Sequence, residues 1–157
     1  MESWISVLVV EDEDHIRQII KYNLELEGFK IQEAENGKVA LEMLRSMEEK
    51  PKVVLSDRMM PEMDGIELLE AIREDYELEK IPVIMLTAKA TIGDIEDAFD
   101  AKADGYITKP FDPEKLGDMI KEKLKDCITN RQKHWNKKEE KPKKVKSATR
   151  NPENLVG

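Results

Sequence analysis

The chain has 157 residues and a formal charge of −8, which is about the length of one domain and enough to bury a hydrophobic core. No run approaches the roughly 18 uninterrupted apolar residues of a membrane span, and the first residues lack the apolar run of a signal peptide, so we expect a cytoplasmic protein without a membrane partner. The single cysteine, Cys127, excludes an intrachain disulfide and is typical of a reducing compartment.

The charge is unevenly distributed along the chain. Residues 1–126 hold 17 basic and 31 acidic residues, a net charge of −14, whereas residues 127–157 hold 9 and 3, a net charge of +6. An acidic body disfavours a nucleic-acid-binding surface, which leaves the basic C-terminal segment as the candidate for such binding.

Five short segments predict β-strands, and a helical pattern follows each of them. The predicted strands are Ile5 with Val7–Val10, Lys30–Ala34, Val53–Ser56, Pro82–Leu86 and Gly105–Thr108. In the segments between them, apolar residues recur three or four positions apart, as on one face of a helix. These positions are Ile16, Ile19, Ile20 and Leu24; Val39, Ala40, Met43, Leu44 and Met47; Ile66, Leu69 and Ile72; and Ile92, Ile95, Ala98 and Phe99.

The alternation of strand and helix, with short connections, predicts an α/β fold: a doubly wound, five-stranded parallel sheet with helices on both faces. The last helical pattern is extended beyond what such a sheet needs. Its apolar positions are Leu116, Ile120, Leu124, Ile128 and Trp135. From residue 137 the composition cannot bury a core, and Pro142 ends any helix. We therefore divide the chain into one domain, residues 1–126, and a basic helical extension with a flexible tail, residues 127–157.

Charged and hydroxyl side chains stand where the predicted strands end. They are Glu11 and Asp12 after the first strand, Asp57 after the third, Thr87 after the fourth and Lys109 after the fifth. Because ligands bind at the carboxyl ends of parallel strands, we expect these side chains to converge in one crevice. Close carboxylates repel one another, and a Mg²⁺ ion shared with a phosphate group relieves that repulsion. Asp57 is also a candidate nucleophile, because carboxylates form aspartyl-phosphates.

Four motifs, in order and each at a strand end, resemble those of the receiver domain of two-component response regulators, of the stand-alone chemotaxis type. They are Glu11-Asp12, the segment D-R-M-M-P-E-M-D-G from Asp57 to Gly65, Leu86-Thr87-Ala88, and Y-I-T-K-P-F from Tyr106 to Phe111. The resemblance implies the flavodoxin-like strand order 2-1-3-4-5 and makes residues 1–126 the receiver domain.

In that family a carboxylate accepts a phosphoryl group from the phosphohistidine of a histidine kinase or a phosphotransfer protein. The resemblance assigns this role to Asp57. It also implies Mg²⁺ as the cofactor, with Mn²⁺ as a substitute. Asp12, Asp57 and the backbone carbonyl of Met59 would bind the metal directly, and Glu11 largely through water.

The resemblance also assigns the residues that hold and sense the phosphoryl group. Thr87 and Lys109 would bind its oxygens. Tyr106 matches an aromatic switch that swings inward as Thr87 moves toward the phosphate, which is a shift between two packings. A cis peptide bond commonly precedes the proline at the position of Pro110, so we predict one here.

The function that follows is signalling rather than ordinary enzyme catalysis, because the chain would catalyse only its own phosphorylation and dephosphorylation. After phosphorylation it would change conformation and bind a downstream effector protein. A homodimer through the face formed by the fourth helix, fifth strand and fifth helix is a further partner that the resemblance implies. Neither nucleic acid nor membrane is expected as a partner.

Several residues depart from the family pattern. Arg58 follows the acceptor where apolar residues are commoner. Met59 and Lys89 occupy positions that tune how fast the phosphoryl group is lost in this family, so its lifetime is not predicted. Lys102 and Gly105 alter a G-A-D-D-Y motif of many DNA-binding regulators, and Gly105 removes an acid used in their dimer.

Other functions remain open from the sequence. A transcriptional regulator would need DNA binding through the tail or a missing output domain, and a tail of about 30 residues is too short for a three-helix DNA reader. An aspartyl-phosphate phosphatase usually carries a second acid where this chain has Met59. A flavodoxin-like FMN carrier needs a phosphate-binding loop where Glu11 begins a run of four acids.

The basic segment 127–157 has three interpretations. The simplest is a solvated extension. The others are a dimer seam around Ile128 and Trp135, and non-specific attraction to an acidic partner.

Overall fold

The computed structural model describes residues 4–88 and 91–127, and these contain a five-stranded parallel sheet in the order β2-β1-β3-β4-β5. The strands are β1 (Ser6–Val10), β2 (Lys30–Ala34), β3 (Val53–Asp57), β4 (Val83–Thr87) and β5 (Gly105–Thr108). The helices are α1 (Asp14–Leu26), α2 (Gly37–Ser46), α3 (Gly65–Glu74), α4 (Ile92–Asp100), the short 3₁₀ helix η1 (Pro113–Lys115) and a last helix described over residues 116–127. The predicted α/β class and strand order are confirmed.

The chain divides into two units between Lys125 and Asp126, and the fold described below is that of the first unit. The predicted continuation of the last helix through Ile128 and Trp135 lies outside the described residues. The boundary we placed at residue 126 stays a prediction.

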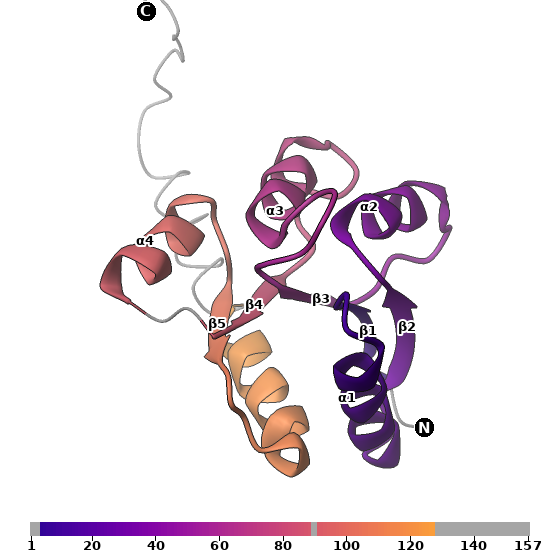
Figure 1. Ribbon diagram of the computed structural model, residues 1–157. Helices are drawn as coiled ribbons and strands as arrows, with labels where there is room; N and C mark the ends of the chain where they lie inside the picture. The colour runs from indigo at the N-terminus through magenta and orange to yellow at the C-terminus, as the bar shows by residue number, and fades with distance from the viewer. Residues whose placement is uncertain (1–3, 89–90, 128–157) are drawn as a thin grey trace, which may run out of the picture. The chain divides into compact units, whose positions relative to one another are not determined.

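The sheet separates two hydrophobic layers, because successive side chains of a strand point to opposite faces. From β1, Val7 and Val9 pack with α1 and the last helix, whereas Leu8 and Val10 pack with α2 and α3. Figure 1 shows α1 on one side of the sheet and α2, α3 and α4 on the other. β1, β3 and β4 are covered on both faces and read as continuous apolar runs, whereas the edge strand β2 exposes Lys30 and Gln32.

The register of the strands brings their carboxyl ends together. Val10 pairs with Ser56, and Asp57 pairs with Leu86. The alignment continues past the strands, because Lys109 N–H donates to the carbonyl of Thr87 over 2.8 Å. The residues that follow each strand therefore meet at one edge of the sheet.

Helix α3 begins at Gly65, directly after its cap residue Asp64. Asp64 accepts a hydrogen bond from the N–H of Glu67, and the Glu67 side chain accepts one from the N–H of Asp64, which together form a capping box. Leu68, Leu69 and Ile72 of this helix are fully buried.

Helix α4 differs from its predicted packing. Of the apolar positions in its pattern, Ala98 is buried, whereas Ile92 is 77% exposed and Phe99 is 48% exposed. Ile95, the fourth predicted position, is half-buried, so two of the four apolar positions predicted from spacing are exposed.

Candidate functional site

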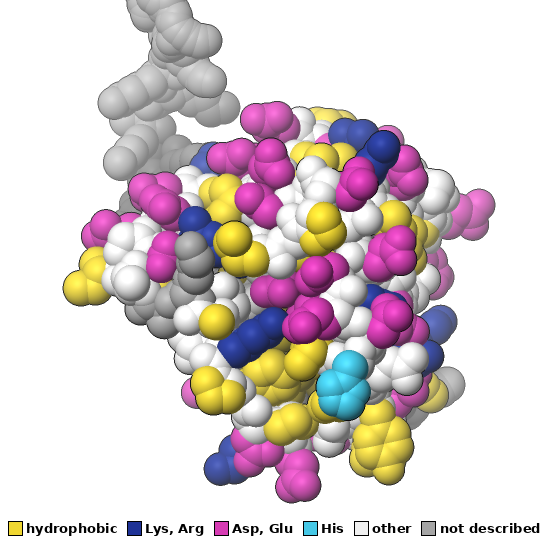
Figure 2. All heavy atoms as spheres, viewed as in Figure 1, with side chains coloured by type: hydrophobic (Ala, Val, Ile, Leu, Met, Phe, Trp, Pro, Cys, Tyr) yellow, Lys and Arg dark blue, Asp and Glu magenta, His cyan; other side chains and the backbone are white. Residues whose placement is uncertain are grey.

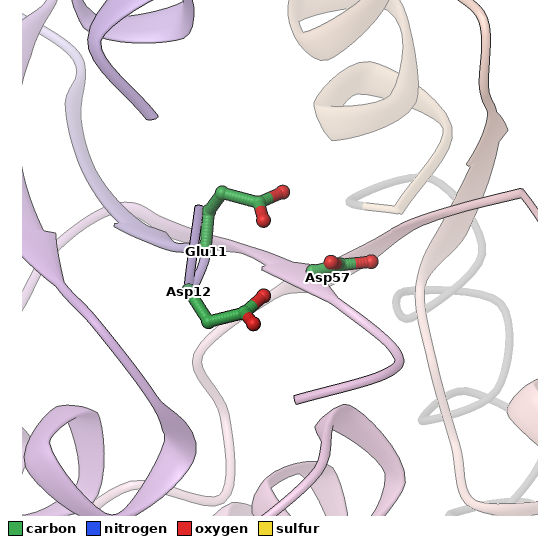
Figure 3. A group of neighbouring side chains, drawn as sticks. All are labelled: Glu11, Asp12 and Asp57. Atoms are coloured by element: carbon green, nitrogen blue, oxygen red, sulfur yellow. The ribbon is translucent and has the colours of Figure 1, made fainter. Parts of the chain in front are cut away.

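Three carboxylates meet at the carboxyl edge of the sheet. Glu11 and Asp12 follow β1, and Asp57 is the last residue of the neighbouring β3. One oxygen from each side chain lies within 4.8 Å of the others, an arrangement that Figure 3 shows. Glu11 is 1% exposed and Asp57 is 7% exposed, so two of the three acids are buried among the ends of the strands.

Lys109 supplies the positive charge of this group. Its Nζ donates to Glu11 Oε1 over 3.1 Å and to Asp57 Oδ2 over 3.4 Å. Lys109 follows β5, which is separated from β3 by β4, so its long side chain reaches across a strand to the acids. The peptide bond between Lys109 and Pro110 is cis, which confirms that prediction.

Burial sets the electrostatics of the cluster. It raises the pKa of Glu11 to about 7, although the N–H of Glu13 donates to Glu11 Oε2 over 3.1 Å and opposes the shift. Burial also raises the pKa of Asp57, with Lys109 opposing. Burial lowers the pKa of Lys109, but the hydrogen bonds and charges of Glu11 and Asp57 outweigh it, so that pKa is raised. One lysine does not offset three acids, and the cluster favours a further cation.

The backbone around Asp57 holds its carboxylate in place. The N–H of Arg58 donates to Asp57 Oδ1 over 2.8 Å. The N–H of Gly65 donates to the carbonyl of Arg58 over 2.8 Å, and a Cβ at Gly65 would overlap the carbonyl oxygen of Asp57. The turn thus folds back on the acceptor position, which only a residue without a side chain permits.

Thr87 and Tyr106 lie on adjacent strands beside this group. Thr87 is the last residue of β4 and is buried. The Tyr106 hydroxyl is buried next to Arg58, Asp94 and Thr87, and burial raises its pKa. Among the described residues, none of these contacts to the hydroxyl has hydrogen-bond geometry. The switch roles of Thr87 and Tyr106 stay predictions.

The structure brings together Glu11, Asp12, Asp57 and Lys109, with Thr87 on the next strand. The side chain of Met59 is exposed, and the metal-binding role of its carbonyl stays a prediction. Lys89 lies outside the described residues. Sequence reasoning missed the role of Arg58, whose guanidinium contacts α4; the available signal was a charged residue where apolar ones are commoner.

Comparisons with known proteins agree with this geometry. The response regulator receiver domain family matches residues 7–121. The chain therefore belongs to the response regulator receiver domain family, as its motifs predicted.

Individual relatives give the same result. The chain is 42% identical over 119 residues to the transcriptional regulatory protein SrrA of Staphylococcus aureus, an alignment covering 76% of this chain and 47% of SrrA. The structure of the chemotaxis response regulator CheY4 of Vibrio cholerae matches with a TM-score of 0.72 at 29% identity, covering 77% of this chain and 99% of CheY4. The structure of a CheY-like receiver from Methanospirillum hungatei matches with a TM-score of 0.71 at 31% identity, covering 82% of this chain and 99% of that receiver.

The chain thus spans about half the length of the curated relatives it matches, and nearly all of the solved receiver structures. Within the described residues, no helix has the length and apolar character needed to cross a bilayer.

Proposed function

We propose that this chain is a phosphorylation-controlled signalling domain that accepts a phosphoryl group on Asp57. One observation carries the proposal: a buried aspartate at the end of β3 lies beside two acids and within 3.4 Å of the Nζ of Lys109. A lone aspartate after a strand would be an ordinary turn residue. An aspartate grouped with a partly buried cation and further metal-binding oxygens is suited to phosphoryl transfer.

The residues present fit a Mg²⁺ ion. Mg²⁺ prefers oxygen ligands, and the three carboxylates each offer one oxygen within a space of 4.8 Å. Asp12 and Asp57 would bind the ion directly together with the carbonyl of Met59, and Glu11 would act through water. Bound there, the ion would neutralise charge on the phosphoryl oxygens; Mn²⁺ accepts the same ligands.

The residues of the chain perform the remaining steps. A carboxylate oxygen of Asp57 attacks the phosphorus of a phosphohistidine, the new O–P bond forms, and the P–N bond breaks with its electron pair returning to the imidazole. Lys109 Nζ and the Thr87 hydroxyl stabilise the equatorial oxygens. The carboxylate must be ionised to attack; burial raises the pKa of Asp57, and the charge of Lys109 opposes that shift and so favours the ionised form.

The donor we propose is a histidine kinase or a phosphotransfer protein in the cytoplasm, and the receiver is residues 1–126. The chain acts only on itself, so it is not an enzyme with a separate substrate. Phosphorylation would shift Thr87 and Tyr106 between two packings and so change binding to a downstream effector protein or to a second copy of the chain.

A second candidate is the receiver part of a transcriptional regulator. The observation that favours it is the 42% identity to SrrA, of which this chain covers 47%. Figure 2 shows many magenta acidic side chains on the viewed face, which does not favour DNA contact there. Retention of the chain on duplex DNA at low salt, lost on removal of residues 128–157, would favour this candidate.

The deciding experiment is incubation with Mg²⁺ and a small acylphosphate, followed by intact mass measurement. We expect one added phosphoryl group, none after removal of Mg²⁺ with a chelator, and none in Asp57→Asn. The matched control is Asp100→Asn, which removes an exposed acid of α4 and should leave labelling unchanged. Labelling of Asp57→Asn at the wild-type level would overturn the assignment of the acceptor.

A further inference from the structure

Helix α4 needs an anchor other than apolar packing. Its fully buried apolar residue is the small Ala98, Ile95 is half-buried, and Ile92 and Phe99 are exposed. Burial of an alanine side chain removes little apolar area from water, so it fixes a helix only weakly. The position of α4 against the sheet therefore depends on polar contacts from neighbouring elements.

Arg58 makes such contacts. One guanidinium nitrogen, Nη1, donates to the carbonyl of Asp94 over 3.0 Å and lies 3.7 Å from Asp94 Oδ1. The other, Nη2, lies 3.6 Å from Asp97 Oδ2. The Arg58 side chain is only 15% exposed, so it spans from β3 to α4 with most of its surface out of water.

The same arginine is bound to the acceptor position through its backbone. Its N–H donates to Asp57 Oδ1, and its carbonyl accepts from the N–H of Gly65 at the start of α3. Its guanidinium also lies near the buried hydroxyl of Tyr106. A single residue thus contacts the proposed acceptor, the first turns of α4 and the surroundings of the proposed switch.

We propose that Arg58 holds α4 to the end of β3 in the unphosphorylated protein and releases it when Asp57 is phosphorylated. This inference rests on the proposed function. Phosphorylation replaces the single charge of the Asp57 carboxylate by a phosphoryl group of roughly −1.5 to −2 charges, a net gain of up to about one negative charge, and brings three strong acceptor oxygens to the residue next to Arg58. The two carboxylates on α4 lie at 3.6 and 3.7 Å, beyond ordinary hydrogen-bond distance, and the contact within that distance is to the neutral carbonyl of Asp94 at 3.0 Å. Charged phosphoryl oxygens accept a stronger hydrogen bond from a guanidinium than a carbonyl does. Transfer of the guanidinium to the phosphoryl oxygens removes these contacts between the end of β3 and α4.

The test compares hydrogen exchange of the α4 amides with and without Mg²⁺ and beryllofluoride, a stable mimic of the phosphoryl group. In the wild type, we expect protection in α4 to fall about tenfold when the mimic binds, equivalent to about 1.4 kcal/mol. In Arg58→Met, protection should already be about tenfold lower without the mimic and should fall no further. The matched control, Arg45→Met, removes an arginine that pairs with Asp75 at 3.2 Å away from this site, and should behave as the wild type.

A second variant tests the same inference if Arg58→Met does not fold. Asp97→Asn leaves the loop after β3 untouched and removes one carboxylate partner of Arg58, so we expect about a twofold loss of α4 protection without the mimic. The inference is overturned if α4 protection in Arg58→Met equals that of the wild type, or still falls tenfold on binding the mimic.

Failure of this inference is distinguishable from failure of the proposed function. Labelling by acylphosphate is measured on the same samples by intact mass, in the wild type and in Arg58→Met. Normal labelling of both with no change in α4 would reject the role of Arg58 alone, whereas absence of labelling in the wild type would reject the acceptor assignment.

Discussion

Helices α3 and α4 cover the same face of the sheet but are held to it by different forces. One face of α3 is fully buried through the side chains of Leu68, Leu69 and Ile72. A capping box stabilises its first turn. In contrast, α4 buries Ala98, exposes Ile92, and is bridged to β3 by a partly buried arginine. Figure 1 shows the two helices side by side above the sheet.

The difference shows how one fold can combine a fixed site with a movable surface. Close-packed side chains have few alternative arrangements, so α3 keeps the turn after Asp57 in one position. Polar contacts between long side chains can be exchanged at small cost, so α4 can adopt a second position when a neighbouring charge changes.

The largest effect is expected at the core of α3. Leu69→Ala removes a fully buried side chain and should lower the free energy of unfolding by about 2–5 kcal/mol. Urea denaturation monitored by circular dichroism measures this change. A loss below about 1 kcal/mol would mean that α3 is not held by its apolar face.

The next largest effect is expected in the pH dependence of the free energy of unfolding of the metal-free protein, which should affect α3 and α4 differently. The ordinary pKa of Glu11 is 4.5 and burial raises it to about 7, so between these values the folded protein binds more protons than the unfolded chain. The free energy of unfolding should therefore fall as pH rises from 4.5 to 7, and the raised pKa of Asp57 adds to the decline.

Denaturation at several pH values in the presence of a chelator measures this slope. Glu11→Gln should flatten it. Because α4 amides exchange by local opening, their protection should not follow the slope, whereas protection in α3 should. A stability that rises across this range would contradict the buried, protonated state of Glu11.

Removal of the helix caps should lower stability by a smaller amount, and the loss should differ between α3 and α4. Asp64→Ala removes the α3 cap and should cost about 1 kcal/mol of global stability. Thr91→Ala removes the hydroxyl that caps α4 and should mainly lower α4 protection, with a global change below about 0.5 kcal/mol. Equal global losses in the two variants would show that α4 unfolds together with the rest.

The smallest effect is expected on the outer face of α4. Ile92 is 77% exposed, so Ile92→Ala should change the free energy of unfolding by no more than about 0.5 kcal/mol. Thermal denaturation of the two proteins in parallel measures it. A loss above 1 kcal/mol would indicate that the apolar stripe of α4 is covered in solution.

The sequence by itself determined the alternation of strands and helices and the residues at the strand ends. Buried parallel strands require continuous apolar runs, and the capping of α3 by Asp64 and Glu67 involves neighbours along the chain. Because the ends of parallel strands share an edge, the meeting of Glu11, Asp57 and Lys109 followed from strand position and family resemblance.

Only the tertiary structure decided what surrounds those residues. The apolar spacing of α4 predicted a buried stripe, but which side of a helix meets the sheet depends on the loops at both of its ends, and Ile92 faces solvent. The raised pKa of Glu11 depends on burial by elements distant in sequence. The contact of Arg58 with Asp94 joins positions 36 residues apart, and no local pattern records a contact that depends on how a loop and a helix are packed.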